Sequence, residues 1–134
     1  MMVYVYAYLA TLAAFLPCDI VWLGTMASRL YRPTLGNILL SDANLPAAGA
    51  FYAIYPIGLV YFAVVPALKS GSLGQATLGG ALFGFFTYMT YDLTNQATLK
   101  NWTTQLTLTD IGWGTVLGAI SASIAFWVTS KFTA

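Results

Sequence analysis

The sequence predicts an all-α integral membrane protein, an antiparallel bundle of four helices, from three observations. Only 7% of the 134 residues are charged and 59% are hydrophobic, whereas about 25% of the residues of a soluble domain are charged. The stretches 43–68, 70–91 and 111–130 contain no charged residue, and each is as long as the roughly 20 residues that a helix needs to cross a bilayer. Residues 1–27 contain only one, Asp19. Strands are not expected, because an open strand cannot face lipid.

The first helix is expected at about residues 3–27. Asp19 costs about 2.5 to 3.5 kcal/mol at a helix centre, which roughly six Leu, Ile, Val or Phe residues offset. Pro17 removes one backbone hydrogen bond and predicts a kink. A cleaved signal peptide is the alternative, but no basic residue precedes the apolar run and the run is too long. We therefore expect a retained membrane helix.

The second and third helices are expected at about residues 45–68 and 73–98, joined by a short turn. Pro46 suits the first turn of the second helix, after a loop rich in turn and cap residues. Ser72 and Gln75 have the spacing of a capping box at the start of the third helix. These two helices should therefore form a tight antiparallel hairpin.

The fourth helix is expected at about residues 106–131. Lys100, Asn101 and Trp102 precede it, and residues of these types mark the membrane interface. No remaining segment is long enough for a soluble domain. Residues 1–134 should therefore form a single transmembrane domain.

Two pairs of glycines predict how the last two helices pack. Gly80 and Gly84 are one turn apart in the third helix, and Gly114 and Gly118 are one turn apart in the fourth. Such pairs allow two helix backbones to approach closely. Both pairs lie about halfway along consecutive antiparallel helices, which favours contact within the chain. A homodimer contact is the alternative.

Charge and residue types exclude several classes of function. The net charge is +1 and the 5 Lys and Arg residues form no run, so nucleic acid is not an expected partner. A single Cys and the absence of His leave no disulfide within the chain and none of the usual zinc ligand sets. We therefore expect no metal site and no cofactor, and no catalytic residue can be assigned.

Three acidic residues stand out because they fall inside or at the ends of expected membrane helices. These are Asp19, Asp92 and Asp110. Acids at such positions are rare and raise a functional hypothesis. With helices alternating in direction, all three lie towards the same face of the membrane.

The same face receives basic and amide side chains from the loops and from the third helix. Asp19-Ile20-Val21-Trp22 and Asp110-Ile111-Gly112-Trp113 also resemble each other, and each places an indole one turn beyond a carboxylate. The candidate ligand-binding residues are Asp19, Trp22, Arg29, Arg32, Tyr88, Asp92, Asn95, Asp110 and Trp113.

Each of these residues also has a purely structural interpretation. The spacing of Thr107 and Asp110 is that of a capping box at the start of the fourth helix. Asp19 and Asp92 would fix helix packing if each paired with an arginine, Asn95 or a tyrosine hydroxyl. The tryptophans would be interfacial anchors. Aromatic residues such as Tyr88 would face lipid or the core rather than a pocket.

Four segments carry a resemblance to a known family. They are Cys18-Asp19-Ile20-Val21-Trp22-Leu23-Gly24, Tyr31-Arg32-Pro33, Tyr91-Asp92-Leu93-Thr94-Asn95-Gln96-Ala97-Thr98 and Asp110-Ile111-Gly112-Trp113-Gly114-Thr115. Over nearly the whole chain the sequence resembles small bacterial membrane proteins catalogued as domain of unknown function 2177. The resemblance implies a multi-pass protein of the bacterial inner membrane. It supplies no function and no catalytic residues.

Three functions fit these observations. The first is binding or translocation of a small ligand, a cation or a proton in a polar cavity between helices that acidic residues line. The second is an accessory subunit of a larger membrane complex. The third is a membrane enzyme acting on a lipid or isoprenoid, with Asp19 or Asp92 as general acid or base and Arg29 and Arg32 holding a phosphate.

The orientation in the membrane follows from the basic residues. Arg29, Arg32 and Lys100 lie on the side of the acidic residues, and Lys69 and Lys131 lie on the other. By the positive-inside rule, the acidic side should face the cytoplasm.

Overall fold

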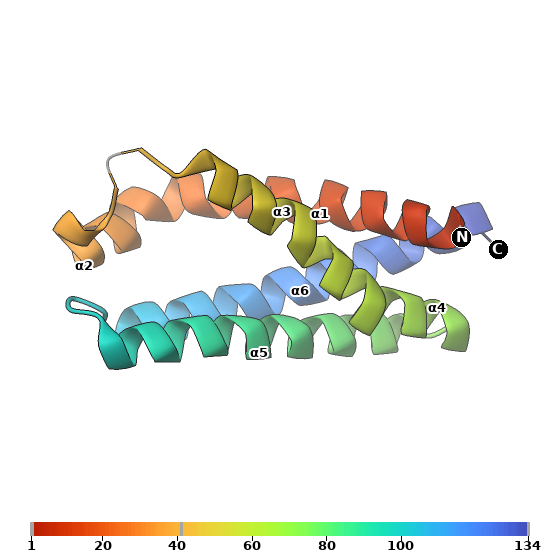
Figure 1. Ribbon diagram of the computed structural model, residues 1–134. Coiled ribbons are helices and arrows are strands. Elements are labelled where there is room, and N and C mark those ends of the chain that lie inside the picture. Colours follow the sequence, from red (N-terminus) through yellow and green to blue (C-terminus); the bar gives the residue numbers. More distant parts are fainter. Residues whose placement is uncertain (1, 41, 134) are drawn as a thin grey trace.

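The computed structural model describes residues 2–40 and 42–133, which form helices and short connections. In chain order the elements are α1 (Met2–Met26), the π-helical turn η1 (Ala27–Tyr31), α2 (Arg32–Leu35), the 3₁₀ turn η2 (Gly36–Ile38), α3 (Leu45–Leu59), the π-helical turn η3 (Val60–Val64), α4 (Val65–Ser70), α5 (Leu73–Thr98) and α6 (Thr104–Thr133). They make four arms, α1 to η2, α3 to α4, α5, and α6 (Figure 1). The first arm stays helical beyond residue 27, where the sequence predicted its end.

The four arms pack as a bundle around α6. Both α1 and α5 run along α6, while the arm from α3 to α4 crosses from α1 at one end of the molecule to α5 at the other (Figure 1). Phe15, Leu59 and Leu117 are fully buried at the centre, where α1, α3 and α6 meet. The two chain ends and α4 share one end of the bundle, and α2 and the connection between α5 and α6 share the other (Figure 1).

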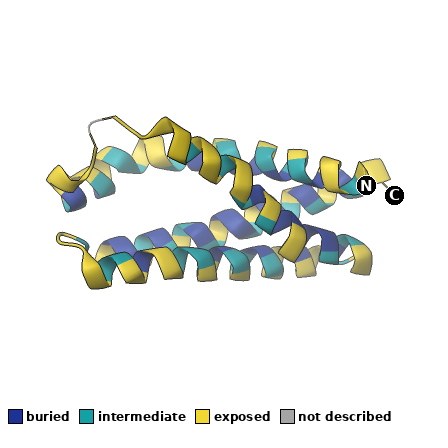
Figure 2. Cartoon of the chain, viewed as in Figure 1, coloured by how far each residue is buried: buried dark blue, intermediate teal, exposed yellow. Residues whose placement is uncertain are grey.

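The outer surface of the bundle is apolar. Three arms are long and apolar enough to cross a membrane, Met2–Ile38, Leu45–Ser70 and Thr104–Thr133. Large hydrophobic side chains such as Ile54, Leu108 and Trp127 are exposed, and exposed residues run along the outward faces of the helices (Figure 2). α5 is more polar, but it lies beside α6 (Figure 1). The molecule is therefore an all-α membrane helical bundle.

The glycine pairs form the closest contact in the bundle. A Cβ atom on Gly84 would lie 2.0 Å from the carbonyl oxygen of Gly114, and one on Gly80 would lie 2.2 Å from that of Gly118. Any larger residue would push α5 and α6 apart. The prediction that the two pairs face each other within the chain is confirmed.

Both π-helical turns end two residues before a proline in the first turn of the next α-helix. Pro33 follows η1 and Pro66 follows η3. A proline has no N–H, and its ring displaces the carbonyl four residues earlier. The backbone widens instead, and the N–H of Arg32 bonds to the carbonyl oxygen of Ala27, a bond spanning five residues that defines a π turn. Pro17, by contrast, lies within a continuous α1.

The helix ends agree with the sequence at one position and differ at another. As predicted, Ser72 Oγ accepts from the N–H of Gln75, at 3.1 Å, at the start of α5. The capping role predicted for Thr107 and Asp110 is wrong. Thr103 Oγ1 caps α6 by accepting from the N–H of Leu106 at 3.1 Å, because the chain reverses so tightly after α5 that α6 begins at Thr104.

Candidate functional site

Asp19 is a buried carboxylate with both oxygens occupied. Its Oδ1 accepts from Trp113 Nε1 at 3.0 Å, and its Oδ2 accepts from the hydroxyl of Tyr52 at 2.6 Å. Its side chain is 5% exposed. These two bonds join α1 to α6 and to α3. Asp19 therefore links three helices through its hydrogen bonds. This agrees with the structural interpretation in which Asp19 pairs with a tyrosine hydroxyl and fixes helix packing.

Asp110 holds a second chain of hydrogen bonds. The hydroxyl of Tyr31 donates to Asp110 Oδ1 at 2.6 Å and accepts from Trp22 Nε1 at 2.9 Å. Tyr31 is the last residue of η1, so the π turn sets the position of this hydroxyl. The chain joins η1 and α1 to α6.

The two tryptophans of the similar tetrapeptides lie against each other. The rings of Trp22 and Trp113 stack with centroids 4.5 Å apart and planes 3° apart. Trp113 donates directly to Asp19, whereas Trp22 reaches Asp110 through Tyr31. The two half-buried indoles thus pair with each other, and their hydrogen bonds link them to the two carboxylates.

Asp92 on α5 differs from the other two acids. Its side chain is 0% exposed, and neither carboxyl oxygen has a hydrogen-bond partner among the described residues. Its carboxyl does lie within interaction distance of that of Asp110. Two carboxylates offer only acceptors, so a bond between them requires a proton on one. A carboxyl buried without a partner costs several kcal/mol or more if it is charged.

Amide groups near Asp92 fasten α5 to α6 instead of pairing with it. Gln96 Oε1 accepts from Thr107 Oγ1 at 2.7 Å, and Gln96 Nε2 donates to Thr104 Oγ1 at 2.8 Å. Asn95 lies one turn after Asp92 but does not bond to it. Neither Asn95 nor Gln96, the two amides near Asp92, hydrogen-bonds to its carboxyl.

The basic residues lie at the same end of the molecule but outside the acidic cluster, defined as Asp19, Asp92 and Asp110. Arg29 lies in η1 and Arg32 in α2, and both are exposed. Over residues 2–40 and 42–133 neither forms an ion pair with a carboxylate within 4.0 Å.

Tyr88 forms one wall beside the cluster. A Cβ atom on Gly114 would lie 2.2 Å from its ring, so the glycine creates the space that the ring fills. Its ring also meets that of Tyr55 edge-on, with centroids 6.3 Å apart. Tyr88 therefore packs between α3 and α6 rather than facing lipid alone.

One comparison with known proteins gives a match. The model of a family described as "Predicted membrane protein", domain of unknown function 2177, matches residues 4–127. The chain belongs to this family. No curated protein and no solved structure matches the chain. The matched span includes the whole acidic cluster of this family member and the helices that carry it.

Two residues of the site were not among the candidates predicted from the sequence. Tyr31 and Tyr52 donate the shortest hydrogen bonds of the cluster, at 2.6 Å each. Tyr31 lies in the segment Tyr31-Arg32-Pro33, which carries part of the family resemblance, whereas nothing local distinguishes Tyr52 from the other tyrosines. Within the described residues, no group of three or more His, Cys, Asp or Glu side chains is arranged to hold a metal ion.

Proposed function

We propose that this protein binds a proton or a small cation at Asp92 and Asp110, between α5 and α6, and that binding there serves translocation across the bacterial inner membrane. The observation that carries the proposal is Asp92. Its buried carboxyl has no hydrogen-bond partner among the described residues. A proton or a cation removes the cost of burying an unpaired carboxylate.

The surroundings of Asp92 favour a small occupant. Its side chain is fully buried, and α5 and α6 are in backbone contact two turns away at Gly84 and Gly114. An amine-bearing organic ligand would have to separate these helices, whereas a proton requires no additional volume. Among small occupants the proton therefore fits best.

Asp110 supports the proposal because it has a second partner. Tyr31 donates to its Oδ1 in the present arrangement. The carboxyl of Asp110 can therefore share a proton with Asp92 or stay hydrogen-bonded when that proton leaves. Because Tyr31 lies on a π turn, a feature frequent at functional sites, a change in the turn would alter the site directly.

The exposed arginines indicate which side the site serves. Arg29 and Arg32 lie at the same end as the acidic cluster, and basic residues flanking membrane helices favour the cytoplasmic side. We place the carboxyl pair within reach of the cytoplasm.

The test is infrared spectroscopy of the protein in liposomes across a pH series. Every protonated carboxyl gives a C=O band, so the readout is a difference: one pH-dependent carboxyl band of the wild type should be missing from the spectrum of Asp92→Asn. Asp42→Asn is the matched control, since Asp42 is exposed in the connection before α3, and it should keep the band.

Flux supplies the second arm of this test. Liposomes that enclose a pH-sensitive dye should show proton entry with the wild type and Asp42→Asn but not with Asp92→Asn. If Asp92→Asn keeps every pH-dependent carboxyl band of the wild type, the site is refuted. A band lost with proton entry unchanged would refute translocation and leave binding only.

A further inference from the structure

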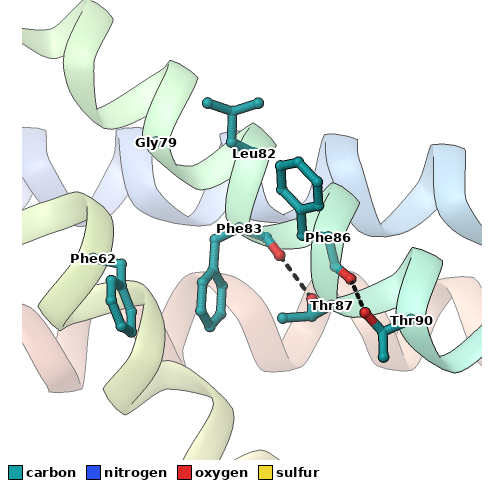
Figure 3. A pocket seen from close by; sticks show the side chains of 7 residues that line it. All are labelled: Phe62, Gly79, Leu82, Phe83, Phe86, Thr87 and Thr90. Carbon is teal, nitrogen blue, oxygen red and sulfur yellow. Dashed lines mark hydrogen bonds between the residues drawn. The ribbon is translucent and has the colours of Figure 1, made fainter.

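An apolar groove lies along α5 and is lined by none of the acidic residues. It has a volume of about 660 Å³ and is formed by α5 and one ring from η3. Its lining residues are Phe62, Gly79, Leu82, Phe83, Phe86, Thr87 and Thr90 (Figure 3). Phe62 and Phe83 stack with centroids 5.7 Å apart, so the groove has an aromatic wall shared by two arms of the bundle.

The groove offers no free hydrogen-bond donor. The hydroxyl of Thr87 donates to the carbonyl oxygen of Phe83 at 2.8 Å, and that of Thr90 donates to the carbonyl oxygen of Phe86 at 2.7 Å (Figure 3). With these hydroxyls occupied within α5, the surface presented to an occupant is apolar. An alkyl chain suits such a surface.

A second hollow adjoins this groove and contains a positive charge. It has a volume of about 410 Å³ and is lined by Tyr4, Tyr61, Phe62, Val65, Pro66 and Lys69. Phe62 lines both hollows, so its ring borders each of them. Lys69 is exposed in the last turn of α4, which is where the arm reaches the end of the bundle (Figure 1).

At this end of the molecule, Lys69 is the lysine that faces an anion most directly. The acidic residues lie towards the opposite end, with Asp92 and Asp110 near the connection between α5 and α6. The other lysine at this end, Lys131, already lies 4.4 Å from the centre of the Trp127 ring. Lysine and tyrosine at the membrane surface bind phosphate by charge and hydrogen bonding.

We propose that Lys69, Tyr4 and the groove along Phe62 and Phe83 form a binding site for one anionic phospholipid, with its phosphate at Lys69 and an acyl chain in the groove. The charge of Lys69 supplies the headgroup selectivity, and the aromatic wall holds the chain. This site is separate from the carboxyl pair, so it stands or falls independently of proton binding.

The headgroup arm of the test uses native mass spectrometry of the detergent-solubilised protein titrated with phosphatidylglycerol or phosphatidylcholine. The wild type should bind the anionic lipid about fivefold more tightly, the ratio expected from one lysine near a membrane surface. Lys69→Gln should lose this preference. Lys100→Gln, at the opposite end, should keep it. Equal affinity of the wild type for both lipids, or an unchanged preference in Lys69→Gln, would overturn the proposal.

The groove arm uses two matched substitutions on α5. Leu82 lines the groove and Leu78, one turn earlier, does not, while both are exposed. Leu82→Trp should obstruct the groove and reduce the binding of both lipids, and Leu78→Trp should bind them as the wild type does. If Leu82→Trp leaves lipid binding intact but dissociates a dimer, the groove is an interface between copies of the chain and the proposal fails.

Discussion

Asp19 and Asp92 are both acids buried in membrane helices, yet their surroundings are opposite. Asp19 accepts a hydrogen bond on each oxygen, from Trp113 and Tyr52. Asp92 accepts none from the described residues, and its neighbour is another carboxyl. In the sequence the two residues look alike, because each is an acid inside an expected membrane helix. The difference shows that a buried acid becomes a functional candidate only when its partners are known, because a satisfied acid is explained by packing.

The largest loss of stability is expected on removing the carboxylate of Asp19. Asp19→Ala leaves the indole of Trp113 and the hydroxyl of Tyr52 buried without an acceptor. We expect a loss of about 2 kcal/mol in the free energy of unfolding, since each hydrogen bond to a charged group contributes about 1.5 to 3 kcal/mol in water and less in membranes. Unfolding by denaturant in detergent micelles measures it.

The matched control for this loss is Asp42→Ala, since Asp42 is exposed outside the helices. Its unfolding curve should coincide with that of the wild type. If Asp19→Ala also coincides with the wild type, the two hydrogen bonds contribute nothing to stability and Asp19 has to be reconsidered as a binding residue.

A smaller effect is expected at Tyr31. Tyr31→Phe removes the donor to Asp110 and the acceptor for Trp22 while keeping the ring. The expected loss in the free energy of unfolding is about 1 kcal/mol. Thermal unfolding followed by circular dichroism measures it, and Tyr61→Phe, on the exposed surface of η3, should unfold as the wild type does. A Tyr31→Phe protein as stable as Tyr61→Phe would show that the Asp110 chain is dispensable for folding.

The position of Tyr31 could not be predicted from the sequence, although most of the fold could. Hydropathy predicts helices because lipid demands apolar runs of fixed length, and the pairing of Gly80 with Gly118 follows from their depth in antiparallel helices. The position of Tyr31 depends on a π turn created by Pro33, and no periodicity records such a turn. Hydropathy therefore predicts that the first helix ends near residue 27, before Tyr31, whose hydroxyl reaches Asp110.

Two other predictions are wrong because they also depend on local packing that the sequence pattern does not determine. The spacing of Thr107 and Asp110 matches a capping box, but Thr103 provides the cap because the turn before α6 is tight. The amide of Asn95 lies one turn from Asp92, yet it does not bond to it. The sequence predicts at which end of the bundle a residue lies, because each residue of a helix adds a fixed rise along the helix axis. Which donor meets which acceptor depends on the rotation of each helix, and only packing sets that rotation.

The smallest effect, and the one of opposite sign, is expected at Asp92. Asp92→Asn replaces an unpartnered carboxyl with an amide of the same size, whose N–H can donate to Asp110. At a pH where Asp92 is charged, the free energy of unfolding should rise by up to about 1 kcal/mol, because the neutral amide removes the cost of a buried carboxylate without a partner. Thermal unfolding in detergent beside Asp42→Asn measures the change. A loss of unfolding free energy as large as that of Asp19→Ala would instead show that Asp92, like Asp19, stabilises the packing of the helices.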